Sequence, residues 1–138
     1  MGSRRRGREA ALQMLFQMDV SGVGSEQAVQ SYWAHLCASK EGEQFANSLV
    51  RGWSSQRDKI DTTIRDVSQH WRLERMAKVD RNILRLGTYE ICYADYIPPQ
   101  AAMNEAIEIA KRFGREDSPK FINGVLDQIL KDTTQPET

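Results

Sequence analysis

The sequence contains little cysteine, little histidine and no long apolar run. Its 138 residues include two cysteines, Cys37 and Cys92, and two histidines. Two thiols without paired histidines are too few to bind a zinc ion. A single pair of cysteines is also too few for the set of disulfide bonds that is typical of small secreted proteins. No apolar stretch approaches the roughly 20 residues that cross a bilayer, and the basic N-terminus lacks the apolar segment of a signal peptide. We therefore expect a protein that stays in the cytoplasm, binds no membrane and carries no metal or cofactor.

Motifs for catalysis are also missing. The sequence has no glycine-rich loop to cradle a phosphate, no nucleophile elbow and no histidine pair at metal-binding spacing. Glu105 and Glu108 have the spacing of a metal site in a helical bundle, but no second carboxylate–histidine pair accompanies them. We therefore predict no catalytic residue and no metal ligand, and hence no enzyme.

The net charge is zero, with 19 basic and 19 acidic residues, but the charges are unevenly distributed. Arg4, Arg5, Arg6 and Arg8 form a basic arm that precedes the first acid, Glu9. A run of this kind is often only a solvated chain end. Here it leads directly into an amphipathic segment, and the forked donors of arginine match phosphate oxygens. The arm is thus a candidate site for binding a few phosphates of a nucleic acid, but it is too small to bind a long duplex.

What the sequence has throughout is helical periodicity, and no segment alternates convincingly with a period of two. Glycine, serine and proline separate the apolar stripes. These stripes lie within residues 8–19, 28–36, 45–53, 60–71, 76–94, 101–112 and 118–131. We predict an all-α fold of about seven helices in two small packed lobes, with a central helix at 76–94 packed on several sides. The expected lobes are residues 4–70 and 71–131, followed by a flexible tail at 132–138.

Two helix starts carry specific signals. Ser55 with Asp58 has the pattern of a capping box, in which the serine would cap the fourth helix. Ser118 followed by Pro119 predicts the start of the last helix, with serine as the N-cap. Proline fits the first helical position because its missing N–H would have no partner there.

The loop before the last helix is a second candidate surface. Residues 111–121 hold four basic residues and two aromatic ones, Phe113 and Phe121, beside a helix N-terminus that favours anions. Proteins read single-stranded RNA by stacking unpaired bases on aromatic rings next to cations. Phe113 continues an apolar stripe, so we expect it in the core. Phe121 fits either a core position or a stacking platform.

Four segments of the sequence together resemble the NusB family of bacterial transcription antitermination factors. They are RRRGREAALQ at 4–13, DRNILRL at 80–86, NEAIEIAK at 104–111 and KFINGVLD at 120–127. They follow the family's order and spacing from residue 4 to about 130. The set is highly specific, although no single piece would be.

The resemblance implies an all-helical, two-lobed protein that pairs with ribosomal protein S ten, also called NusE. The pair binds the boxA element of nascent single-stranded RNA, as part of an RNA polymerase antitermination complex on ribosomal RNA operons. By position, the resemblance implies that the RNA-binding residues are Arg4, Arg5, Arg6, Arg8, Asp117, Ser118, Lys120 and Phe121. It implies that the partner-binding residues are Phe16, Glu74 and Asp80. Many members have tyrosine at the position of Phe16. Because phenylalanine lacks the hydroxyl group, Phe16 cannot make a contact that depends on it.

Two other classes of function remain open at this point. A related helical domain occurs at the N-terminus of an RNA cytosine methyltransferase, so the chain could be an RNA-binding accessory domain of an enzyme. Against this, the helices account for the whole chain and leave no room for a cofactor-binding sheet. The chain could also be a homodimeric protein-interaction module with an incidental basic arm. RNA binding measured with and without the partner separates these alternatives.

Overall fold

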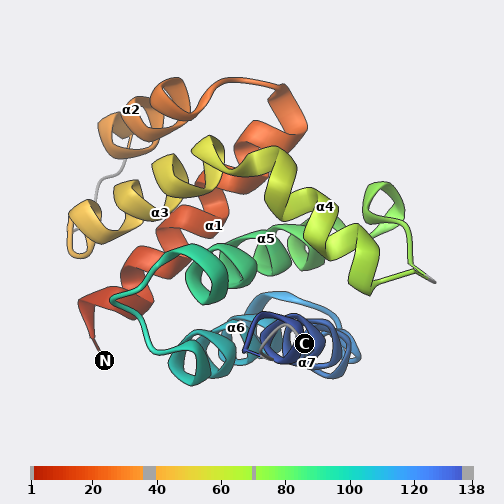
Figure 1. Ribbon diagram of the computed structural model, residues 1–138. Helices are drawn as coiled ribbons and strands as arrows, with labels where there is room; N and C mark the ends of the chain where they lie inside the picture. Colours follow the sequence, from red (N-terminus) through yellow and green to blue (C-terminus); the bar gives the residue numbers. More distant parts are fainter. Residues whose placement is uncertain (1, 36–39, 70, 135–138) are drawn as a thin grey trace. The chain divides into compact units, whose positions relative to one another are not determined.

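The computed structural model describes residues 2–35, 40–69 and 71–134. These residues form α-helices and one short 3-10 turn, η1, with no strand among them (Figure 1). In chain order the elements are α1 (Ser3–Ser21), α2 (Ser25–His35), α3 (Glu43–Ser55), α4 (Arg57–Val67), η1 (Leu73–Arg75), α5 (Lys78–Tyr93), α6 (Pro99–Phe113) and α7 (Ser118–Thr134). The all-α prediction is confirmed. Cys37 and residues 135–138 of the expected tail lie outside the described residues. No described helix is long and apolar enough to cross a membrane.

The chain divides into two compact units, one ending at Ser55 and the other beginning at Gln56. The division falls earlier than the boundary near residue 70 that we expected, because α4 packs against α5 and α7. Ile60 and Ile64 of α4 are fully buried. Periodicity marked the apolar face of α4 correctly, but it could not indicate which helices cover that face.

In the first unit, α1 packs on α2 and α3, and α2 also contacts α3. Met14 and Leu15 of α1 and Leu49 and Trp53 of α3 are almost entirely buried. Between α2 and α3, the indole N–H of Trp33 donates a hydrogen bond of 2.7 Å to Oδ1 of Asn47. The buried residues of α1 extend from Gly7 to Met18, so this core reaches the last of the four N-terminal arginines, Arg8.

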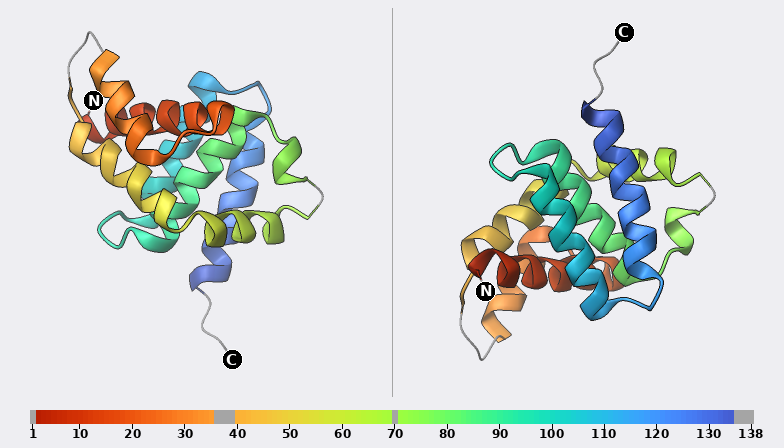
Figure 2. Two further views of the ribbon diagram at one scale, coloured as in Figure 1. Left: turned by 90° about the horizontal axis from the view of Figure 1, so that it is seen from above. Right: turned by 90° about the horizontal axis from the view of Figure 1, so that it is seen from below.

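In the second unit, α5 contacts α4, α6 and α7, which agrees with the predicted central helix. Figure 2 shows α5, α6 and α7 side by side from two directions. A Cβ atom on Gly87 would lie 2.9 Å from Cδ1 of Leu126, so glycine permits the close approach of α5 and α7. The start of α7 is thereby held near the start of α5, where the second candidate surface lies.

The predicted helix starts differ from the structure in detail. The expected capping box does not form: the hydroxyl of Ser55 donates to the carbonyl of Gly52, and the N-cap residue of α4 is Gln56. Serine at the end of one helix can bond back to its own last turn, and here that bond forms in place of the cap.

At the C-terminal side of the described chain, α7 continues to Thr134, so the first residues of the expected tail are helical.

Candidate nucleic-acid interface

The N-terminal arginines lie in the first two turns of α1. The apolar stripe had predicted a helix from Arg8, but α1 begins at Ser3, so the arm is helical. Arg4 and Arg6 are exposed and Arg5 is half-buried, whereas only 5% of Arg8 is exposed. Three of the four arginines are therefore presented on the surface, and the fourth is part of the packing.

Two glycines fix the start of α1 against the turn before α3. Gly42 has a φ of 78°, in the left-handed region, and a Cβ there would collide with the backbone of α1. A Cβ on Gly7 would lie 2.9 Å from Cδ2 of Phe45. The close crossing places the guanidinium carbons of Arg4 and Arg8 at 5.3 and 5.2 Å from the centroid of the Phe45 ring. These contacts are within the range of cation–π interactions, and they hold the arginine segment in place.

The charge of this helix start opposes the helix dipole. The first turn of α1 has no acidic residue, and its N-cap, Gly2, offers no side-chain cap. A basic residue at an N-terminus forgoes the roughly 0.3–1 kcal/mol that an acidic one gains there. Local rules of this kind are broken most often where a protein binds something. A phosphate at this position would meet both the arginines and the backbone N–H groups of a helix start.

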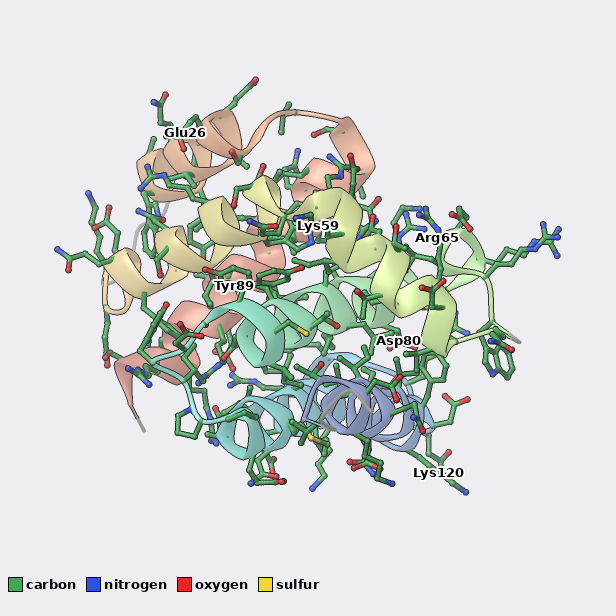
Figure 3. All side chains as sticks on the ribbon, in the orientation of Figure 1. Glu26, Lys59, Arg65, Asp80, Tyr89 and Lys120 are labelled. Carbon is green, nitrogen blue, oxygen red and sulfur yellow. The ribbon has the colours of Figure 1, made fainter. Side chains whose placement is uncertain are left out.

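In the second unit, most of the predicted residues of the last loop and α7 surround one cavity of about 710 Å³. Asp117, Lys120 and Phe121 line it together with Asp80 of α5 and Trp71, which precedes η1. Figure 3 labels Asp80 and Lys120, one on α5 and the other at the start of α7. The volume lies within the range of small-ligand sites.

The aromatic wall of the cavity is a pair of rings. The rings of Phe121 and Trp71 meet edge to face, with centroids 5.9 Å apart and planes at 74°. Phe121 is half-buried, while its neighbour Ile122 is fully buried, so Phe121 lies at the cavity and not in the core. Trp71 is 63% exposed and was not among the predicted site residues. Its position had been assigned to the stripe of the fourth helix, which ends at Val67.

Phe113 and Ser118 differ from their predicted roles. The prediction of a core position for Phe113 is wrong: its side chain is 43% exposed, with the guanidinium carbon of Arg112 at 5.3 Å from the ring centroid. Ser118 is 1% exposed, and its hydroxyl accepts a hydrogen bond of 2.9 Å from the backbone N–H of Arg115. It therefore stabilises the turn before α7, whereas we had expected it to cap the helix itself.

The three residues predicted to bind a partner lie in different settings. Phe16 is 38% exposed on α1. Glu74 accepts hydrogen bonds of 3.0 and 2.7 Å from Arg65, and Figure 3 labels this arginine on α4. A backbone hydrogen bond, followed by the contact with Arg65, lowers the pKa of Glu74. A partner at Glu74 must therefore bind the ion pair or displace Arg65.

Asp80 lies with the predicted RNA-binding residues of the second unit, although we had grouped it with the partner-binding ones. Its Oδ1 atom is buried and has no hydrogen-bond partner among the described residues. No pattern in the sequence indicates this, because the burial of a single oxygen atom depends on the neighbouring helices.

Groups with catalytic potential are sparse in the described part of the chain. No cluster of histidine, cysteine, aspartate and glutamate there is arranged to hold a metal ion. Cys92 is half-buried beside the hydroxyl of Thr133, and burial raises the pKa of its thiol. A raised pKa leaves little thiolate at neutral pH, so this cysteine is a poor nucleophile.

Comparison with known proteins places the chain in one family. The sequence model of the NusB family matches residues 5–131. The transcription antitermination protein NusB of Sorangium cellulosum is 44% identical over 131 residues, which cover 95% of this chain and 94% of that protein. The solved structure of T. maritima NusB has 39% identity and a TM-score of 0.83, covering 96% of this chain and 93% of its own. A chain in a crystal structure of antitermination factors NusB and NusE in complex with double-stranded RNA is 26% identical, with a TM-score of 0.83. The match covers 94% of this chain and 97% of that chain.

Proposed function

Because the chain belongs to the NusB family, we propose that it is a transcription antitermination factor that binds RNA together with ribosomal protein S ten (NusE). The RNA is the single-stranded boxA element of ribosomal RNA transcripts, and the complex acts with RNA polymerase in the cytoplasm. The observation that carries the proposal is the similarity to a NusB that was solved with NusE and double-stranded RNA.

The described side chains support a role in binding RNA. In the first unit, exposed arginines lie at a helix N-terminus that has no acidic residue. In the second unit, Trp71 and Phe121 lie beside Lys120 at an open cavity. Cations bind the RNA backbone and aromatic rings stack on unpaired bases, so each unit offers one of the two kinds of contact.

Replacing Arg4, Arg5 and Arg6 with alanine together should weaken RNA binding and flatten its salt dependence. Each phosphate contact contributes about 0.7–0.9 to the slope of log affinity against log salt, so the loss of two or three contacts is measurable. Fluorescence anisotropy with a boxA RNA at several salt concentrations provides the test. The thermal midpoint should change little, because removing three charges that oppose the helix dipole offsets the loss of the contact between Arg4 and Phe45.

The matched control is Arg8→Ala, which removes one arginine of the same arm. Because Arg8 is buried against Phe45, its loss should lower the thermal midpoint and change the salt slope less than the triple substitution. An unchanged slope for the triple variant would show that the arm does not contact RNA.

Phe121→Ala tests the aromatic wall. We expect RNA affinity to fall by roughly 1–3 kcal/mol, as for other stacking platforms. A core phenylalanine would instead cost about 3–5 kcal/mol of unfolding free energy. Affinity and urea denaturation are measured on the same variant, and Phe113→Ala makes the same change at an exposed ring that does not line the cavity. A large loss of stability with unchanged affinity per folded molecule would contradict the assignment of Phe121.

A further inference from the structure

We propose that Phe45 of α3 is a positioning residue for RNA binding: its ring holds Arg4 of the basic arm in place for a phosphate, without touching the RNA itself. The inference rests on the proposed function and adds to it a residue from a second helix. It combines three observations: the face of α1 that the ring contacts, the glycine that makes room for the ring, and the different exposure of the two arginines beside it.

The ring of Phe45 lies against one face of α1. Arg4, Gly7 and Arg8 share this face, because residues three and four positions apart are neighbours on a helix. A Cβ atom on Gly7 would meet Cδ2 of Phe45 at 2.9 Å and the carbonyl oxygen of Gly42 at 3.0 Å. Glycine at position 7 therefore leaves the space that the ring occupies beside the two arginines.

The two arginines contact the ring from different settings. Cζ of Arg4 lies 5.3 Å and Cζ of Arg8 5.2 Å from the centroid of the Phe45 ring, within the range of cation–π interactions. Arg8 is 5% exposed, Phe45 is half-buried and Arg4 is exposed. The ring thus joins a cation that is part of the packing to a cation that RNA can reach.

A cation–π contact is compatible with phosphate binding by the same arginine. The N–H donors of a guanidinium group lie in its plane, and the ring attracts the cation without using any of them as a hydrogen-bond donor. An arginine side chain loses rotamer freedom when a phosphate fixes it, and this loss weakens binding. A side chain that a ring already holds has less freedom to lose, so Phe45 should strengthen the binding of RNA through Arg4.

Arg6 provides a comparison within the same arm. It is two positions from Arg4, and residues at that spacing do not face each other on a helix. Its Nε atom lies 3.4 Å from Oε2 of Glu41, in an exposed ion pair. The ring of Phe45 should therefore matter for the contribution of Arg4 to RNA binding and not for that of Arg6.

The experiment is a double-mutant cycle in which boxA RNA binds the full chain at low salt, measured by fluorescence anisotropy. Phe45→Leu should weaken binding about fivefold, which corresponds to about 1 kcal/mol, the strength of an exposed cation–π contact. In the Arg4→Ala background the same change should weaken binding less than about twofold, because the residue through which the ring acts is missing. In the Arg6→Ala background the loss should remain about fivefold.

Phe45→Tyr separates the effect of the ring from that of packing. Tyrosine keeps an aromatic face, so RNA affinity should stay within about twofold of that of the unaltered chain. Urea denaturation gives the folded fraction of each variant, and affinity is compared per folded molecule. If leucine destabilises the fold, pentafluorophenylalanine at position 45 replaces it in the test. That side chain keeps the ring but reverses the charge of its face, so it should weaken binding as Phe45→Leu does.

Three outcomes would overturn the proposal while leaving the proposed function intact, provided that the arm still contributes to the binding of boxA RNA. Equal losses from Phe45→Leu with and without Arg4 would mean that the ring contacts RNA or supports the whole arm. Equal losses for Phe45→Tyr and Phe45→Leu would identify a packing role. Unchanged affinity in Phe45→Leu would show that the ring does not contribute. Failure of the chain to bind any RNA, even with the partner, would instead contradict the proposed function and the inference together.

Discussion

Arg85→Met is expected to lower the free energy of unfolding by about 3–5 kcal/mol, because it leaves a buried carboxylate without its partner. Arg85 donates hydrogen bonds of 3.0 and 3.1 Å to the two oxygens of Asp61, and the two side chains are 8% and 10% exposed. A third bond of 2.9 Å joins Arg85 to Oδ1 of Asn82. Urea denaturation at neutral pH measures the loss.

Two controls identify the cause of this loss. Asp61→Leu combined with Arg85→Met removes both charges and should recover much of the stability, since apolar residues often replace a buried ion pair without loss. Arg51→Met breaks an exposed pair with Glu26, in which the side chains are 52% and 61% exposed, and should leave the urea midpoint nearly unchanged. Equal losses for Arg85→Met and Arg51→Met would contradict a special role for burial.

The helices could be predicted from the sequence because apolar periodicity and the proline and glycine signals are local. The start of α1 could not. Three arginines oppose the dipole of the helix they begin, so local rules favour a start near Arg8. The structure starts the helix at Ser3, where contacts around Gly7 and Gly42 fix the segment against the turn before α3. Such contacts join residues far apart in the sequence.

The candidate site could be predicted only in part, for a similar reason. Lys120 and Phe121 stand beside a helix start, and their residue types alone suggested RNA. Trp71 was missed because it continues the stripe of α4, although the helix ends before it. The same kind of pattern predicts a core position for Phe113. However, Phe113 is the last residue of α6, and there the apolar stripe continues into a part of the helix where the side chain is exposed. Periodicity indicates which face of a helix is apolar, but it does not indicate how far along the helix that face is covered by neighbouring helices.

Addition of ribosomal protein S ten is expected to tighten RNA binding by about 10²-fold or more, which is the largest change in affinity that we predict. The chain carries no net charge, and its two basic segments, at 4–8 and 111–121, hold eight cations, several of which stand near acids such as Glu116 and Asp117 in the sequence. At physiological salt, charges are screened over about 8 Å, so the chain alone should hold RNA weakly. When one strand contacts both proteins, the second contact becomes intramolecular and gains about 10²–10⁴ in affinity.

Thermodynamic linkage makes this cooperativity testable, since RNA must tighten the protein pair by the same factor by which the partner tightens RNA binding. Titrating all four steps of the cycle measures both factors. Phe16→Ala should weaken the binding of the partner, and of RNA only when the partner is present, because Phe16 is exposed on α1 and is predicted to contact that protein. Val20→Ala, at a more exposed apolar side chain one turn further along α1, is the control and should have a smaller effect. If the partner left RNA affinity unchanged, the cooperative mechanism would be wrong. If Phe16→Ala weakened RNA binding equally with and without the partner, Phe16 would be an RNA contact.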